Sequence, residues 1–177
     1  LRVEARDMVR QSGTVGVFVT HDPEDVMALA DQVVLLSNGR VLQAGTPREL
    51  FDQPRSAQVA ALFGQAQTVA AVLADNQLQT VFGSWPLESI SPHADLSRLQ
   101  PGVQLSLSVR PDSLALQHDD SGRVILELRI AGADDVAEID DGRGGRLFAR
   151  VARPHSLGPG CRVRVVPRIG SVFLFSG

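Results

Sequence analysis

The sequence predicts an α/β segment over residues 1–64 followed by an all-β domain over residues 65–177. Two observations carry this prediction. Up to Gly64, apolar runs of strand length alternate with helical patterns that have capping residues at their ends. From Gln65 onward, alternating apolar and polar residues are separated by Pro-Gly and Gly-rich turns, and no pattern of ordinary helix length occurs. A length of 177 residues with 44% hydrophobic content fits two small globular domains.

The α/β segment begins with helix, strand and helix. Residues 1–12 have a helical pattern that starts with no capping residue ahead of it, so we expect the sequence to be a piece of a longer protein. The run Val15–Val19 has the length and β-branched content of a buried parallel strand. Asp22 as the N-cap and Pro23 at the first helical position then predict a short helix over residues 24–30.

A hairpin is predicted next. Val33–Leu36 reads as a second buried strand, and Asn38-Gly39 is a strong signal for a two-residue turn that pairs this strand with residues 40–44.

Two short helices complete the segment. Thr46–Glu49 has the form of a capping box with proline at the first helical position, which predicts a helix through Phe51. Ser56 caps the second helix, and Gly64 ends it. Three apolar residues are expected on its inner side, namely Val59, Leu62 and Phe63.

Two strands of the β domain follow the same kind of turn. Pro101-Gly102 precedes the alternating run Val103–Val109, and Pro159-Gly160 precedes residues 161–165. The parallel suggests two related half-units, although similar turns also recur by chance in β domains. Short strands with frequent turns predict a small barrel or sandwich. Further strands are expected at residues 124–130, 136–139 and 147–151.

His21 is the candidate functional residue. It follows the run Val15–Val19 at its carboxyl end, which is the edge where open α/β sheets bind ligands, and it precedes the N-cap Asp22. Spacing alone leaves a second interpretation open, in which His21 is a turn residue that bonds to the backbone.

Several short motifs follow one another between residues 19 and 51. They are Val19-Thr20-His21-Asp22, Ala28-Leu29-Ala30-Asp31, Asn38-Gly39-Arg40-Val41 and Gly45-Thr46-Pro47-Arg48-Glu49-Leu50-Phe51. Their order and spacing resemble the switch-histidine segment and tail of an ABC-transporter ATPase subunit. That family commonly has Glu-Glu-Ala where this chain has Glu24-Asp25-Val26. The resemblance implies that residues 1–64 are an α/β fragment of a P-loop ATPase domain. In that domain His21 contacts the γ-phosphate of ATP, as a catalytic and cofactor-binding residue.

A second resemblance covers residues 65–177. Val109-Arg110-Pro111-Asp112-Ser113-Leu114 is similar to the Val-Arg-Pro-Glu segment of the TOBE domain, with Asp112 in place of the usual Glu. This resemblance implies an all-β, OB-like (TOBE) barrel domain. The ferric-iron importers are nearest in overall pattern, including the apolar ending Val172–Phe175, but sugar, polyamine, sulfate and molybdate importers share the architecture.

Together the two resemblances imply the C-terminal fragment of the ATP-hydrolysing subunit of a binding-protein-dependent ABC importer, with a β domain that is regulatory or dimer-forming. Such a parent subunit uses ATP and Mg²⁺ and works as a homodimer. It contacts transmembrane permease subunits at the inner, cytoplasmic face of the cell membrane. This sequence has no Lys and no phosphate loop, so we expect the chain alone to be inactive and to bind no cofactor. The alternative is an oxyanion or small-metabolite binding module of the molybdate-binding type.

Other partners and ligands are not expected. A net charge of −3 argues against nucleic acid, and no apolar run reaches the length of a membrane span, so direct membrane insertion is not expected. The single Cys161 cannot form an internal disulfide. No metal site is expected, because the three other histidines share no ligand spacing; they are His93, His118 and His155.

Two further features have competing interpretations. Trp85 reads as a hydrophobic plug or, less simply, as an aromatic contact to a small ligand. Four arginines on strand faces expected to be exposed are either ordinary surface charge or a place for an anion; they are Arg110, Arg129, Arg150 and Arg162.

Overall fold

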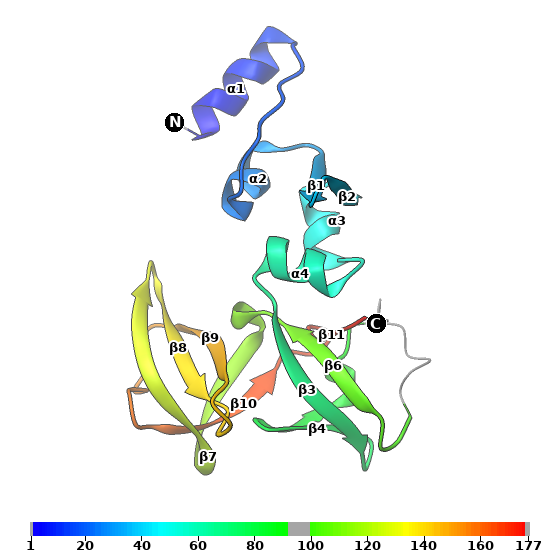
Figure 1. Ribbon diagram of the computed structural model, residues 1–177. Coiled ribbons are helices and arrows are strands. Elements are labelled where there is room, and N and C mark those ends of the chain that lie inside the picture. The colour runs from blue at the N-terminus through cyan, green and yellow to red at the C-terminus, as the bar shows by residue number, and fades with distance from the viewer. Residues whose placement is uncertain (1, 92–99, 176–177) are drawn as a thin grey trace. The chain divides into compact units, whose positions relative to one another are not determined.

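The computed structural model describes residues 2–91 and 100–175 (Figure 1). The chain divides into two compact units, residues 1–64 and residues 65–177. We call them the N-terminal unit and the β unit. The sequence changes character at the same position, where helical patterns give way to strand alternation.

The N-terminal unit contains four helices and one hairpin in its described residues. They are α1 (Arg2–Ser12), α2 (Pro23–Leu29), β1 (Val33–Ser37), β2 (Arg40–Gly45), α3 (Pro47–Asp52) and α4 (Ala57–Gly64). Its largest buried apolar side chains are those of Leu50, Val59 and Phe63. The polar Gln43 is also buried, because its amide donates to the Gln53 carbonyl at 3.1 Å and accepts from the Arg55 backbone N–H at 2.9 Å.

Local sequence signals decide where these elements begin and turn. Asp22 caps α2 by accepting from the Glu24 N–H at 2.9 Å, and Thr46 and Glu49 form the capping box of α3. Asn38 and Gly39 both have positive φ angles, 50° and 72°, which a two-residue hairpin turn requires. The predicted hairpin and the predicted N-caps Asp22 and Thr46 are therefore confirmed. The left-handed stop predicted at Gly64 is wrong, because Gly64 is the last residue of α4 and the residue with positive φ is Gln65, at 53°.

The predicted strand at Val15–Val19 is wrong for this structure. Residues 14–20 have no regular secondary structure, and three of the valine side chains are almost fully exposed, Val15 at 94%, Val17 at 86% and Val19 at 99%. A buried parallel strand needs hydrogen-bonded neighbours on both sides, and the only sheet that the described residues form in this unit is the β1–β2 hairpin.

Two other expectations of burial fail in the same unit. Val34 and Leu36 of β1 are exposed, so β1 is not a strand buried on both faces. Leu62 of α4 also faces solvent, whereas Val59 and Phe63 are buried as expected. In each case about half or more of the apolar side chain stays accessible to solvent.

The β unit contains nine strands in its described residues, in two sheets. The strands are β3 (Gln67–Ala74), β4 (Gln77–Thr80), β5 (Gly83–Pro86), β6 (Gln104–Val109), β7 (Leu114–Ala131), β8 (Asp134–Asp140), β9 (Arg146–Ala152), β10 (Arg162–Pro167) and β11 (Phe173–Leu174). Single 3₁₀ turns lie at η1 (Leu87–Ser89) and η3 (Pro111–Ser113). One sheet has the order β11-β6-β3-β4-β5 and the other β10-β7-β8-β9, with all named strand pairs antiparallel. The chain is thus mostly β, and its backbone pairing forms two sheets rather than one continuous barrel.

The two sheets repeat one topology. In β6-β3-β4-β5 and in β10-β7-β8-β9, the fourth strand of the half pairs beside the first, the order of a Greek key. Each fourth strand follows a Pro-Gly turn, and the glycine N–H donates to the first strand at 2.8 Å, Gly102 to Leu73 and Gly160 to Ile125. The two related half-units suggested by the sequence are confirmed at the level of topology.

The second half differs from the first by a bulge in β7. From the first to the last residue of β6, the paired positions on β3 are five residues apart. From the first to the last residue of β10, the paired positions on β7 are ten residues apart, so the five residues 119–123 are extra. Asp119 holds the bulge together: one carboxylate oxygen accepts from Ser121, and the other accepts from Arg164 at 2.8 and 2.9 Å. Gly122 is needed here because a Cβ would collide with the Val163 carbonyl.

Side chains join the two sheets over one core. The fully buried Trp85 of β5 donates its indole N–H to the Val165 carbonyl of β10 at 2.8 Å. The Gln67 amide, at the start of β3, donates to the Phe148 carbonyl and accepts from the Phe148 N–H of β9, each at 2.7 Å. The burial of Trp85 expected of a plug is confirmed, and its polar atom is already bonded within the protein.

The predicted exposure of Arg110 is wrong. In β6, Leu105, Leu107 and Val109 face the core as the alternation predicts, but Ser108 and Arg110 on the other face are also buried. The Arg110 guanidinium lies 4.7 Å from the centre of the Phe173 ring, so the C-terminal strand β11 covers this face.

We expect Trp85→Phe to lower the free energy of unfolding by about 1–3 kcal/mol, because it leaves the buried Val165 carbonyl without its donor. Urea denaturation followed by far-UV circular dichroism measures this change. Ile130→Ala, at a side chain that is 79% exposed, is the control and should stay within about 0.5 kcal/mol of the wild type. Equal effects of the two variants would contradict the proposed junction.

A pH-dependent prediction follows from the bulge. Hydrogen bonds from Ser121 and from the Arg164 guanidinium lower the pKa of the Asp119 carboxyl from its usual 3.8 to about 2. Because the folded state has the lower pKa, this carboxylate stabilises the fold fully above pH 3.8, and the contribution is lost as the pH falls towards 2.

Thermal unfolding between pH 5 and pH 2 should therefore be less steeply pH-dependent in Asp119→Asn than in the wild type. The matched control is Asp120→Asn, whose side chain is 99% exposed and which should follow the wild-type curve. An unchanged slope in Asp119→Asn would show that the bulge does not depend on this charge.

Candidate functional site

The turn that carries His21 is built by its neighbours. The Thr20 hydroxyl accepts from the Asp22 N–H at 3.1 Å and donates to the Asp25 carboxylate at 3.1 Å. Asp22 in turn caps α2, and Pro23 occupies the first helical position. The backbone on the carboxyl side of His21 is therefore fixed by three hydrogen bonds and a proline.

The imidazole of His21 itself is exposed. Among the described residues it has no hydrogen-bond partner, so its ring is not the backbone-bonded turn histidine that spacing alone allowed. A neutral imidazole has one donor and one acceptor nitrogen, and here both are accessible to a ligand. The turn thus presents a hydrogen-bonding side chain from a rigid base.

Two of the other histidines have carboxylate neighbours within the β unit. His93 lies outside the described residues. His118 is exposed and lies 3.9 Å from Asp120. His155 bonds to the Asp135 carboxylate at 2.9 Å, with both side chains largely buried, a pair that sequence spacing does not reveal because the two residues lie on β8 and on the loop after β9.

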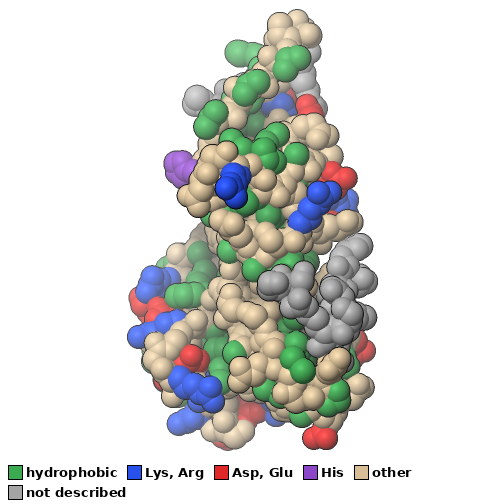
Figure 2. Space-filling model, turned by 45° about the vertical axis from the view of Figure 1, so that its right-hand side comes forward, with side chains coloured by type: hydrophobic (Ala, Val, Ile, Leu, Met, Phe, Trp, Pro, Cys, Tyr) green, Lys and Arg blue, Asp and Glu red, His purple; other side chains and the backbone are tan. Residues whose placement is uncertain are grey.

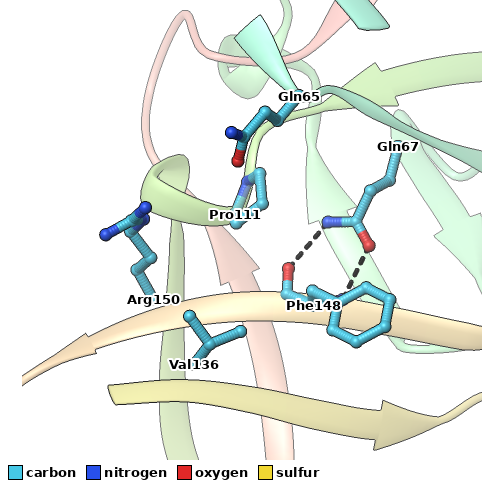
Figure 3. Close-up of a pocket in the computed structure, with 6 residues that line it drawn as sticks. All are labelled: Gln65, Gln67, Pro111, Val136, Phe148 and Arg150. Carbon is cyan, nitrogen blue, oxygen red and sulfur yellow. Dashed lines mark hydrogen bonds between the residues drawn. The ribbon is translucent and has the colours of Figure 1, made fainter. Parts of the chain in front are cut away.

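A second candidate site is a pocket of about 240 Å³ in the β unit (Figure 3). It lies on the side of β8 and β9 that faces away from the core, next to the bonded Gln67–Phe148 pair. Its lining residues are Gln65, Gln67, Pro111, Val136, Phe148 and Arg150. Of these, only Arg150 is a candidate ligand contact in the sequence. Pro111 belongs to the motif Val109–Leu114, and the other four belong to no motif, because the pocket is assembled from four separate segments.

The four candidate arginines have different environments. Arg110 is buried, Arg129 is paired with two glutamates, and Arg162 donates to the Gly122 carbonyl at 3.1 Å. Arg150 alone of the four lines the pocket.

In residues 2–91 and 100–175, no helix has the length and apolar character that crossing a bilayer requires.

Comparison with known proteins gives a consistent group of relatives. No protein-family model matches the chain. The spermidine/putrescine import ATP-binding protein PotA of Pseudomonas fluorescens is 31% identical, with 98% of this chain and 47% of the relative covered. The sn-glycerol-3-phosphate import ATP-binding protein UgpC of Chromobacterium violaceum is 30% identical over 99% of this chain and 48% of the relative. The Fe(3+) ions import ATP-binding protein FbpC 1 of Rhizobium meliloti is 26% identical over 100% and 50%.

The chain spans about half the length of the curated relatives it matches. Among solved structures, the cytoplasmic molybdate-binding protein ModG is similar over 63% of this chain and 96% of its own, with 14% identity and a TM-score of 0.45, a likeness too weak to assign a fold.

The role of the His21 turn can be separated from that of its ring. We expect Asp22→Ala to speed hydrogen exchange of the α2 amides about fivefold, because loss of an N-cap costs about 1 kcal/mol. His21→Ala should leave this exchange unchanged, because the exposed ring bonds to nothing in the described chain. Equal effects of the two substitutions would assign the imidazole a structural role.

Proposed function

The chain is homologous over nearly its whole length to the ATP-binding subunits of ABC importers, and we propose that it is the C-terminal part of such a subunit. The observation that carries this proposal is that the similarity runs through both units rather than one. On this proposal, residues 1–64 are the last part of an ATPase domain and residues 65–177 are an OB-like TOBE domain with a regulatory or dimer-forming role.

The exposed apolar residues of the N-terminal unit support this proposal. Val15, Val17 and Val19, together with Val34 and Leu36 on the hairpin, lie at the surface (Figure 2 shows hydrophobic side chains over this unit). Large apolar side chains exposed in this number favour contact with other protein. A larger ATPase domain supplies that contact, with Val15–Val19 as a strand among neighbours from the rest of the domain.

We assign His21 as the residue that contacts the γ-phosphate of ATP. Bound Mg-ATP supplies the phosphoryl group that is transferred to water. The exposed imidazole can donate a hydrogen bond to a phosphate oxygen, where charge changes during transfer, and the Thr20–Asp22–Asp25 hydrogen bonds hold the turn that presents it. A histidine alone cannot assemble a nucleotide site, so the 177-residue chain is expected to be inactive by itself.

The cargo is proposed only as a small solute delivered by a binding protein. The relatives are named for polyamine, glycerol phosphate and ferric iron import, and the ferric-iron relative has a lower identity, 26%, than the other two, 31% and 30%. The ferric-iron assignment therefore has no advantage over the others. The proposed partners are a second ATPase subunit and the transmembrane permease subunits, at the cytoplasmic face of the membrane.

In a longer form of this protein that carries a phosphate-binding loop, we expect His21→Ala to lower kcat for ATP hydrolysis by about 10²–10³-fold, the cost of removing one donor from a developing charge. Arg40→Gln, at an exposed position of the same unit, should keep the wild-type rate.

The 177-residue chain alone should give no binding heat with Mg-ATP in isothermal titration. Tight binding by this chain, or full activity of His21→Ala in the longer protein, would contradict the assignment of His21.

A further inference from the structure

The outer face of β7, β8 and β9 carries a set of paired charges. Arg129 bonds to Glu127 at 2.8 Å and to Glu138 at 3.0 Å, and Arg146 bonds to Glu138 at 2.7 Å. Both glutamates on this face are therefore already engaged. The hydrogen bonds from Arg129 also lower the pKa of the Glu127 carboxyl, so it stays ionised and paired.

Arg150 is the cation that remains on this face. It lies opposite Val136, two pairs along the β8–β9 ladder from Glu138 and Phe148 and on the same face. In the described parts of the chain the Arg150 guanidinium forms no hydrogen bond or ion pair. The carboxylate of Asp134, the next acidic side chain on this face, also forms none there. A guanidinium is always charged and presents paired N–H donors that match a carboxylate, so this one is available for an anion.

The backbone of Arg150 also faces away from its neighbouring strand. Phe148 uses its N–H and carbonyl to bond Gln67, so these groups point away from β8. In an antiparallel ladder the direction repeats every second residue, and the same groups of Arg150 therefore lie on the open edge of β9. The edge of β9 beside the pocket thus offers the Arg150 amide N–H as a further donor.

A hydrogen-bonded pair of residues bounds one end of the pocket, and three other side chains bound the opposite end. Figure 3 shows the bonded Gln67–Phe148 pair at one end and the side chains of Arg150, Pro111 and Gln65 at the other. Val136, Pro111 and Phe148 supply apolar surface, while the Gln65 carboxamide has no partner among the described residues and adds a donor. The volume of about 240 Å³ lies below the roughly 300–1,000 Å³ typical of drug-sized ligands, which limits the occupant to a small molecule.

The pocket also belongs to the part of the β unit that breaks the internal repeat. The β7–β8 hairpin is longer than its counterpart β3–β4, and Val136 and Arg150 lie on this extension, so the first half has no equivalent of the pocket. The topology that the two halves share therefore does not explain the presence of this pocket in the second half.

We propose that this pocket binds a small organic acid, with its carboxylate on the Arg150 guanidinium and its apolar body against Val136, Phe148 and Pro111. The binding site lies wholly within the β unit and does not depend on the ATPase role assigned to His21. The apolar lining distinguishes the expected ligand from an inorganic oxyanion, which has no apolar body to bury.

The test is NMR titration of the ¹⁵N-labelled 177-residue chain with acetate, butyrate, benzoate, phosphate and molybdate at constant ionic strength. We expect the amide signals of Val136, Phe148 and Arg150 to shift, with benzoate and butyrate binding more tightly than acetate. Arg150→Gln should weaken benzoate binding about tenfold or more, since a charge-assisted bidentate pair is lost.

Two further variants separate charge from shape. Val136→Phe keeps the charge but fills the pocket, and it should also abolish binding. Arg143→Gln removes the same charge from an exposed loop position of the β unit and should bind like the wild type. Equal affinity of Arg150→Gln and Arg143→Gln, signal shifts at another place, or tighter binding of phosphate or molybdate than of benzoate would overturn the proposal.

Discussion

The β unit depends on closing two sheets that the backbone leaves separate. Each half satisfies its own ladders, but the edges of β5 and β9 still have to meet the other half. Trp85 and Gln67 make these junctions by bonding side-chain nitrogen and oxygen atoms to backbone groups across the core. Because buried backbone groups need partners, these side-chain bonds help to hold twenty buried residues in one core.

The N-terminal unit, unlike the β unit, has no large buried core among its described residues, and its proposed function rests on this difference. It buries only a few apolar side chains around α3 and α4, while the valines before His21 and those of the hairpin remain at the surface. Hydrophobic burial is the main favourable term in folding, so a segment of this composition is suited to a larger assembly. The run Val15–Val19 lies just before His21. The exposure of its valines and the exposure of the imidazole therefore have one explanation, an ATPase domain larger than residues 1–64.

Local features could be predicted from the sequence, and non-local ones could not. The Asn38-Gly39 turn and the capping residues Asp22 and Thr46 depend only on residues next to them in the sequence. The alternation in β6 and β10 likewise identifies the buried face of a single strand. The conformation of Val15–Val19 depends on strands outside the run itself, so its composition alone predicted wrongly. Burial of Arg110 depends on Phe173, and the pocket depends on side chains from four segments, which no spacing in the sequence records.

Hydrogen exchange measured by mass spectrometry is the most direct test of the central claim, that residues 1–64 complete their fold only within a larger ATPase domain. In the 177-residue chain we expect amides of residues 14–20 to exchange at the rate of an unstructured peptide, while those of β3, β6 and β7 are protected. In a longer form with the complete ATPase domain, residues 14–20 should become protected to the same degree as a central strand. Strong protection of residues 14–20 in the 177-residue chain, or none in the longer form, would contradict the claim.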